Sequence, residues 1–203
     1  LESVAGEIRL VAGLLGERRT VRRIHWGGGT PTFLTPLQLA RLHASLLDEL
    51  ELERGADLSI EVDPVVTTPA HLATLAALGF TRISMGVQDF DPLVQETVRR
   101  RQDFDDTRSL VGLARTLGFT SVNLDLIYGL PHQTPETWAR TLDRVVEIAP
   151  DRVAAFSFAF VPLARPHQRL LPAAAIPTGL AKLELFALAH DRLVAAGYRA
   201  IGM

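Results

Sequence analysis

One pattern recurs along this sequence: a threonine–proline pair, an amphipathic stretch, a glycine, and then an apolar stretch. Each threonine offers a capping hydroxyl before a proline at the first helical position, where the missing N–H costs nothing. A glycine followed by an aromatic residue then ends the helical stretch. The pairs are Thr35-Pro36, Thr68-Pro69 and Thr134-Pro135, and the glycines are Gly79, Gly118 and Gly197. Helices alternating with strands in this way predict βαβ units and a parallel sheet.

The same pattern places the elements. A helix is expected at the start of the chain, because Val4, Ile8, Val11 and Leu15 recur at helical spacing. Strands are expected at 21–26, 57–63, 82–88, 121–127, 152–159 and 198–202. The chain opens at Leu1 and closes on an apolar run ending at Met203, so we expect a fragment of a longer protein.

The alternation inside the strands distinguishes two α/β architectures. Residues 58–63, 83–88 and 122–126 alternate apolar and polar side chains. A strand covered by helices on both faces would be almost continuously apolar. We therefore expect an α/β fold of the partial (βα) barrel type, with a parallel sheet and a single domain over residues 1–203. Its polar face would carry Glu61, Gln88 and Asp125 near the carboxyl ends of their strands, where barrels place their chemistry.

A glycine loop follows the first strand, at Gly27-Gly28-Gly29-Thr30-Pro31. Consecutive glycines let a ligand touch the backbone, and their N–H groups can hold a carboxylate or phosphate. The loop lacks the lysine of a phosphate-binding loop and the spacing of a dinucleotide fingerprint. A plain turn between strand and helix is the alternative.

The polar residues of the inner face also have two interpretations. They could be a satisfied polar filling of a barrel, or they could bind a ligand. Two carboxylates and an amide that share one wall beside a glycine loop need a ligand, a cation or a network, because an unpaired buried carboxylate is costly. We therefore favour a binding site formed by Glu61, Gln88 and Asp125.

Composition excludes several functions. The 203 residues are 47% hydrophobic with a net charge of −2, which gives no basic field for nucleic acid or an anionic membrane. No apolar run is long enough to span a membrane. The sequence has no cysteine, so it holds no disulfide, thiolate nucleophile or thiolate metal site, and this fits a cytoplasmic protein. The six histidines show no paired metal-ligand spacing, and His25 is expected to be structural.

Read together, four segments resemble the oxygen-independent coproporphyrinogen III oxidases of the radical S-adenosylmethionine superfamily. The segments occur in the family's order, and the resemblance continues through Pro166-His167-Gln168-Arg169 to the end of the chain. They are residues 24–34 (IHWGGGTPTFL), 59–64 (SIEVDP), 84–90 (SMGVQDF) and 123–131 (NLDLIYGLP).

This resemblance implies oxidative decarboxylation of two propionates of coproporphyrinogen III, which gives protoporphyrinogen IX in haem biosynthesis. A 4Fe-4S cluster would cleave S-adenosylmethionine to a 5′-deoxyadenosyl radical that removes the propionate hydrogen. Family members bind two S-adenosylmethionines. Carried over by motif, Gly28 and Glu61 would contact one of them. The other would be contacted by Gly29, Thr30, Gln88, Arg100, Asp125 and Ala159.

The sequence departs from the family in three respects. The family's cluster ligands lie in a three-cysteine loop upstream of the part matched here, and this chain has no cysteine, so we expect truncation and an inactive fragment. Phe158 and Phe160 replace a tyrosine and a histidine of the family pattern, which puts in doubt any proton transfer there. We also expect the family's C-terminal substrate-covering domain to lie outside these 203 residues.

Two alternatives stay open. A radical S-adenosylmethionine-like haem chaperone shares the glycine loop, although Asp63-Pro64 and Asp89-Phe90 favour the oxidase. A non-catalytic cofactor-binding remnant would also explain the missing cysteines. The expected partner is coproporphyrinogen III, with no nucleic acid and no membrane, while the electron donor and acceptor and the catalytic residues are not identified.

Overall fold

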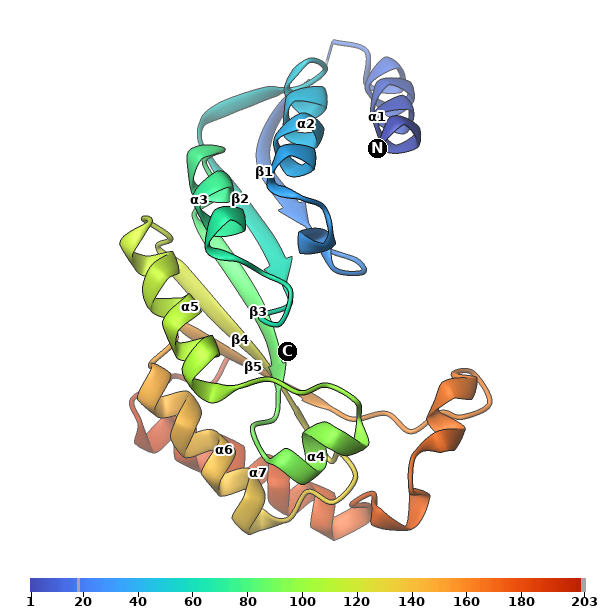
Figure 1. Cartoon of the computed structure of the whole chain (residues 1–203), viewed down its shortest axis with the longest axis vertical. Helices are drawn as coiled ribbons and strands as arrows, with labels where there is room; N and C mark the ends of the chain where they lie inside the picture. The colour runs from blue at the N-terminus through green and yellow to red at the C-terminus, as the bar shows by residue number, and fades with distance from the viewer. Residues whose placement is uncertain (18, 202–203) are drawn as a thin grey trace. The chain divides into compact units, whose positions relative to one another are not determined.

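The computed structural model describes residues 1–17 and 19–201, in which helices alternate with parallel strands (Figure 1). The strands are β1 (Thr20–Trp26), β2 (Glu51–Val62), β3 (Arg82–Gln88), β4 (Ser121–Tyr128) and β5 (Arg152–Ser157). The α-helices are α1 (Glu2–Leu15), α2 (Pro36–Leu47), α3 (Pro69–Ala77), α4 (Pro92–Thr97), α5 (Phe104–Thr116), α6 (Pro135–Ile148) and α7 (Gly179–Ala195). Short 3-10 helices are η1 (Pro31–Phe33), η2 (Pro166–Leu170) and η3 (Ala173–Ala175).

The sheet has the strand order β1-β2-β3-β4-β5, and the described ladders are parallel. Five of the six expected strands are confirmed. The sixth, expected at 198–202, is wrong for residues 198–201, which belong to no strand, while residue 202 lies outside the described residues. Gly197 does end α7 with a φ of 94°, but the apolar residues after it find no strand to pair with. A ladder needs a neighbour as well as an apolar sequence.

Backbone contacts divide the chain into two compact units. Unit 1 comprises Leu1–Met85 and Gly112–Val122, and unit 2 comprises Gly86–Val111 and Asn123–Met203. Each is described below by itself. The expectation of a single domain over the chain stays a prediction.

In unit 1 the helices α2 and α3 pack against each other beside β1 and β2 (Figure 1). Both helices begin with a capping box, in which Thr35 and Thr68 accept from the third helical N–H while the side chains of Gln38 and His71 reach back to the cap. Leu39 of α2 and Leu72 and Leu75 of α3 are fully buried. The threonine–proline helix starts are therefore confirmed.

In unit 2 the helices α6 and α7 lie side by side (Figure 1). Thr134 begins α6 with a third capping box. Trp138 is fully buried, and its indole N–H donates to the carbonyl oxygen of Leu185 in α7 at 3.0 Å. Leu142, Val145 and Ile148 continue the buried apolar stripe along this amphipathic helix.

The polar and apolar faces of the strands separate as expected. Leu58, Ile60 and Val62 of β2 are buried, while Ser59 and Glu61 between them are half-buried. The strands β3 and β4 show the same alternation of buried apolar and half-buried polar positions. The apolar face contributes side chains to the core, while the polar face is only half-buried and can contact a ligand.

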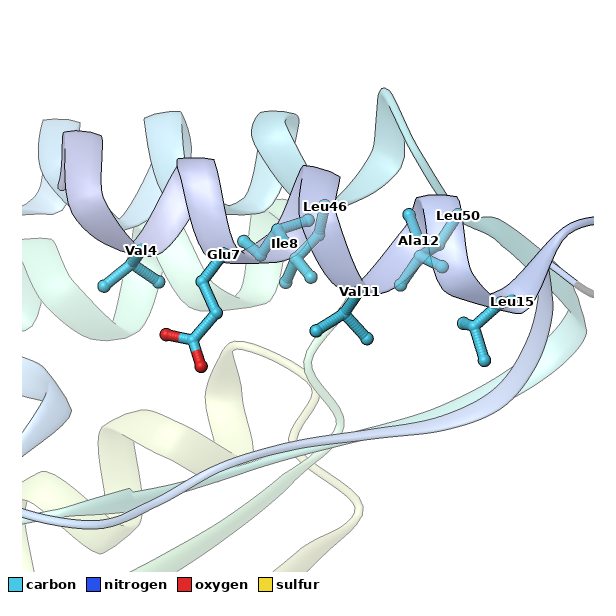
Figure 2. A pocket seen from close by; sticks show the side chains of 8 residues that line it. All are labelled: Val4, Glu7, Ile8, Val11, Ala12, Leu15, Leu46 and Leu50. Atoms are coloured by element: carbon cyan, nitrogen blue, oxygen red, sulfur yellow. The ribbon is translucent and has the colours of Figure 1, made fainter.

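The helix α1 has an apolar face that is only partly covered. Ala12 is buried, whereas Val11 and Leu15 each remain 47% exposed. Together with α2 this face lines a groove of about 220 Å³, shown in Figure 2. Its lining residues are Val4, Glu7, Ile8, Val11, Ala12, Leu15, Leu46 and Leu50. Among the described residues, no helix is long and apolar enough to cross a membrane.

Candidate functional site

The glycine loop connects the end of β1 to η1 in unit 1. Gly27, Gly28 and Gly29 are all exposed, and Gly28 has a φ of 109°, a conformation that favours glycine. Among the described residues other than the adjacent ones in the chain, no atom lies within 4 Å of the place where a Cβ would stand on Gly28 or Gly29. Thr30 then precedes η1 in an extended conformation. The backbone of this loop is therefore accessible to a ligand.

Two tethers hold the end of the loop against the segment that follows β2. The Thr32 hydroxyl lies 2.9 Å from the Thr67 hydroxyl, which in turn donates to the carbonyl oxygen of Asp63 at 2.7 Å. The second tether is His71, whose Nε2 lies 3.0 Å from the carbonyl oxygen of Leu34. The Nδ1 of His71 accepts from the Thr68 backbone N–H, so Nε2 carries the proton and donates to Leu34.

Glu61 lies near the end of β2, on the polar face of unit 1, with its side chain 46% exposed. Its Oε1 is 3.2 Å from Nε2 of His25, and Nδ1 of His25 is 2.9 Å from the Ser59 hydroxyl. In the β1–β2 register His25 stands opposite Ser59, which brings all three side chains to one face. A carboxylate in this position can accept hydrogen bonds from an ammonium or from ribose hydroxyls.

Gln88 ends β3 in unit 2 with an unusual backbone. Its φ is 68°, and the N–H of Asp89 donates to the carbonyl oxygen of Val87 at 2.9 Å. A positive φ with a hydrogen bond from residue i+2 to residue i defines a γ-turn of the strained type. The strand therefore breaks at the residue that the motif assigns to ligand binding.

Arg100 approaches the strand residue Gly86 from the segment after α4. Its Nη2 donates to the Gly86 carbonyl oxygen at 3.2 Å, and Gln102 donates to the same oxygen at 2.7 Å. A Cβ on Gly86 would stand 2.9 Å from the amide nitrogen of Gln88 and 3.0 Å from Nη2 of Arg100. Gly86 therefore lets the Gln88 and Arg100 side chains approach one backbone position.

Asp125 lies on the polar face of β4, two residues after Asn123. The Asn123 amide donates to Oδ1 of Asp125 at 2.7 Å, and both side chains are half-buried. This contact orients the carboxylate, because residues i and i+2 of a strand share a face.

Ala159 is exposed in the segment after β5, and polar side chains hold that segment on both sides. Gln168 donates to the Ala159 carbonyl oxygen at 2.9 Å and accepts from the N–H of Val161 at 2.6 Å. The ammonium of Lys182 donates to the carbonyl oxygen of Phe158. A backbone held in this way can present its own groups to a ligand, which fits the expectation that Ala159 acts through its main chain.

Asp89, next to Gln88, is 1% exposed. Its Oδ1 accepts from the Asp91 N–H at 2.6 Å and from the Thr141 hydroxyl at 2.7 Å, and its Oδ2 accepts from the Gln133 amide at 2.5 Å. Burial raises the pKa of Asp89, and these three hydrogen bonds oppose part of that rise. The sequence motif placed Asp89 beside the ligand residues, whereas the structure gives it a role in holding β3 to α6.

The structure brings the candidate residues together in separate groups. In unit 1 the glycine loop meets Glu61, since a Cβ on Gly27 would stand 3.1 Å from the Glu61 carboxylate. In unit 2 the Gln88 and Arg100 side chains meet at Gly86, and Asp125 pairs with Asn123. The expectation that Glu61, Gln88 and Asp125 share one wall stays a prediction.

Sequence reasoning missed two contributors. His25 was expected to be structural, but it contacts Glu61 directly. Gln168 lies in the segment 166–169 that resembles the family, and its side-chain amide positions the Ala159 carbonyl oxygen. The alternation of residues along β1 predicts which face of the strand His25 is on. Its position opposite Ser59, however, depends on the register in which β1 and β2 pair.

The site residues differ in the cofactors that they fit. Accessible loop backbone, a half-exposed carboxylate and a glycine cradle at Gly27 suit a small ligand with ammonium, carboxylate and hydroxyl groups. Within residues 1–17 and 19–201, no three histidine, cysteine, aspartate or glutamate side chains group as a metal site. The sequence has no cysteine, so this chain offers no thiolate to an iron–sulfur cluster.

Comparison with known proteins identifies the family. The family model described as the radical SAM superfamily matches residues 2–145. The chain belongs to the radical SAM superfamily. Membership implies S-adenosylmethionine and a 4Fe-4S cluster as the cofactors of the family, and of these two groups the residues present here fit only the first.

The similar radical SAM proteins include two curated relatives named oxygen-independent coproporphyrinogen III oxidase. The one from Pseudomonas aeruginosa is 44% identical over 100% of this chain, which covers 45% of that protein. The one from Salmonella typhimurium is 45% identical, again over 100% of this chain and 44% of the relative. The chain thus spans less than half the length of these relatives.

Solved structures give the same result for the fold. The coproporphyrinogen III oxidase of Escherichia coli, described as a radical SAM enzyme, superimposes with a TM-score of 0.96 at 44% identity. The match covers 100% of this chain and 46% of the E. coli chain. Elp3 from Methanocaldococcus infernus reaches a TM-score of 0.64 at 16% identity over 91% of this chain and 48% of the other, which shows the fold alone. The expected fold class, an α/β partial (βα) barrel of the radical SAM type, is confirmed.

Proposed function

We propose that this chain is the S-adenosylmethionine-binding part of a longer oxygen-independent coproporphyrinogen III oxidase. The observation that carries the proposal is the similarity to the E. coli enzyme, at 44% identity over the whole of this chain with a TM-score of 0.96. The longer protein would convert coproporphyrinogen III to protoporphyrinogen IX in the cytoplasm, and would supply from elsewhere the cysteines that this chain lacks.

In this proposal the candidate residues contact two S-adenosylmethionine molecules. Gly28 and Glu61 of unit 1 serve one S-adenosylmethionine: the loop N–H groups donate to its carboxylate, and Glu61 accepts from its ammonium or ribose hydroxyls. Gln88, Arg100, Asp125 and Ala159 of unit 2 serve a second S-adenosylmethionine, to which motif similarity also assigns Gly29 and Thr30. The count of two rests on the resemblance to the family.

The chemical work of these residues is binding and orientation. When bound, S-adenosylmethionine supplies the radical that starts oxidative decarboxylation. Glu61 and Asp125 can accept hydrogen bonds from hydroxyl and ammonium groups, Gln88 can both donate and accept, and the planar guanidinium of Arg100 can donate two parallel hydrogen bonds to a carboxylate. Correct orientation matters because a misplaced reacting atom costs orders of magnitude in rate.

Binding measurements on the longer protein test the proposal. We expect Glu61→Gln to weaken S-adenosylmethionine binding about tenfold, since a hydrogen bond to a charged group contributes about 1.5–3 kcal/mol. Equilibrium dialysis with labelled S-adenosylmethionine measures this change. Glu53→Gln is the matched control, because Glu53 lies on the same strand and pairs with Arg22.

The reaction itself needs a second assay. The longer protein, reconstituted under anaerobic conditions, should convert coproporphyrinogen III to protoporphyrinogen IX with consumption of S-adenosylmethionine. Haem binding without decarboxylation would identify a haem chaperone instead. Unchanged S-adenosylmethionine affinity in Glu61→Gln would contradict the assignment of the unit 1 site.

A further inference from the structure

The unit 1 site contains an ordered histidine that motif similarity leaves without a role. His25 stands near the end of β1 with both ring nitrogens in contact: Nδ1 is 2.9 Å from the Ser59 hydroxyl, and Nε2 is 3.2 Å from Oε1 of Glu61. Both partners lie on β2, and His25 pairs in register with Ser59. The ring therefore cannot turn without losing one of two contacts.

The proton positions favour a donation from His25 to Glu61. The Ser59 hydroxyl also lies within hydrogen-bond distance of the Ile24 carbonyl oxygen, at 3.3 Å. A carboxylate oxygen can only accept, so Nε2 must carry a proton for the contact with Glu61. Ser59 can then either donate to Nδ1 of a neutral ring or, while donating to Ile24, accept from a protonated ring. In both arrangements Nε2 of His25 points its proton at Glu61.

The glycine loop closes over this pair. A Cβ on Gly27 would stand 2.9 Å from Nε2 of His25 and 3.1 Å from both Cδ and Oε1 of Glu61. Gly27 is not among the glycines with positive φ, so its backbone does not itself require glycine. A Cβ at this position would instead displace the ring of His25 or the carboxylate of Glu61, so the pair lies directly against the loop that we assign to ligand binding.

Stability alone does not account for the pair. The two side chains are 50% and 46% exposed, and a polar contact between side chains this exposed to water contributes little to folding. A long glutamate side chain at a strand end has several rotamers, and a second contact selects among them. The consequence of the His25 contact is therefore the orientation of the Glu61 carboxylate.

We propose that His25 is a positioning residue that holds the Glu61 carboxylate beneath the glycine loop, in the orientation that receives S-adenosylmethionine. This inference rests on the proposed function, because it takes Glu61 as a ligand contact. Specifically, His25 affects ligand binding through the hydrogen bond from its Nε2 to Glu61.

Two substitutions of His25 test the contributions of its two ring nitrogens separately. In His25→Gln the side-chain amide reaches the position of Nε2 and keeps a donor toward Glu61. In His25→Asn the shorter amide replaces Nδ1 and keeps only the Ser59 contact. We expect His25→Asn to weaken S-adenosylmethionine binding about three- to tenfold in the longer protein, and His25→Gln to retain most of the affinity.

His190→Asn is the matched control. His190 of α7 also contacts a carboxylate, since its Nδ1 lies 2.9 Å from Asp191, and its side chain is 47% exposed. We expect this variant to bind S-adenosylmethionine as the parent protein does. Thermal melts of all variants check that the histidine substitutions leave folding intact.

A double-mutant cycle tests whether His25 acts through Glu61. If it does, His25→Asn costs nothing further once Glu61→Gln is present, so the two effects are non-additive. Additive losses would overturn the positioning role, and so would equal affinities of His25→Asn and the parent while Glu61→Gln still binds weakly. If Glu61→Gln itself binds normally, the proposed site fails instead, which separates the two claims.

Gly27→Ala gives an independent measurement with both polar side chains intact. The added Cβ would displace the ring of His25 or the carboxylate of Glu61 from its present position, so we expect weaker S-adenosylmethionine binding than in the parent. Gly13→Ala in α1 is the control, because among the described residues no atom lies within 4 Å of its Cβ position. Parental affinity in Gly27→Ala would contradict the proposed packing of the loop on the pair.

Discussion

At Gln88 the requirements of folding and of ligand binding conflict. A non-glycine residue with a φ of 68° in a γ-turn is strained by about 1–3 kcal/mol, and such strain concentrates at functional sites. The next residue, Asp89, is locked into a buried network, which keeps the turn in place. The side chain at this position is therefore held where an ordinary strand would not put it.

This strain predicts a difference between two small substitutions at Gln88. Both Gln88→Ala and Gln88→Gly remove the amide, but only glycine adopts a positive φ without cost. We expect Gln88→Gly to be more stable than Gln88→Ala by about 1 kcal/mol, measured as the free energy of unfolding in denaturant. Equal stabilities would show that the turn is not strained.

His25, by contrast, shows what a sequence leaves undetermined at this scale. The sequence motif alone identifies the glycine loop and Glu61 as candidate ligand contacts, and the structure places them next to each other. The pairing of His25 with Glu61 depends on the register of two strands that are 34 residues apart at their contact with Ser59. No local pattern encodes that register, so the sequence alone does not predict the contact between His25 and Glu61.

Among the elements, β3, the segment after β4, and α6 are joined through Asp89. Gln133 donates to Asp89 while its Oε1 accepts from the N–H of Gly129 at 2.6 Å, which fixes the orientation of its amide. Thr141 adds the contact from α6. Each of the three partners of Asp89 is a donor in this arrangement, so the residue must offer acceptors only.

Asp89→Asn should therefore destabilise the protein in spite of its near-identical shape. The new amide NH2 must face either the Gln133 amide or the Asp91 N–H, so two donors meet in a buried site. We expect a loss of about 1–3 kcal/mol at neutral pH, measured by denaturant unfolding. Asp105→Asn on α5 is a control, because Asp105 is exposed. A neutral effect of Asp89→Asn would mean that the network can reorganise.

The raised pKa of Asp89 adds a dependence on pH. A carboxyl group whose pKa is higher in the folded state binds more protons folded than unfolded, so its ionisation lowers stability as pH rises. This loss of stability occurs in the pH range that begins near 3.8, the ordinary pKa of the carboxyl group, and ends at its raised pKa in the folded protein. We expect the stability difference between the parent and Asp89→Asn to shrink as pH rises through this range. A difference that grows would contradict the direction of the shift.

The element pattern explains why most of the fold could be predicted. Threonine–proline caps and glycine stops are local signals, and all three capping boxes and five of six strands follow them. The failure at residues 198–201 has a different cause. A glycine–aromatic pair ends a helix by itself, but an apolar run becomes a strand only where another strand lies beside it.

For the molecule as a whole, the absence of cysteine gives the plainest prediction. Reconstitution of these 203 residues with iron and sulfide under anaerobic conditions should yield no iron–sulfur absorption, because the chain offers no thiolate. The longer protein, treated in the same way, should absorb in the visible range. A cluster on the 203-residue chain would refute the proposed division of ligands.

The path of the chain through its two units limits how the molecule can be divided. The backbone passes from one unit to the other three times: within β3 at Met85 and Gly86, within α5 at Val111 and Gly112, and within β4 at Val122 and Asn123. Neither unit is a continuous segment, so no single truncation can express one alone. Recombination that exchanged either unit would therefore cut through the two strands β3 and β4 and the helix α5.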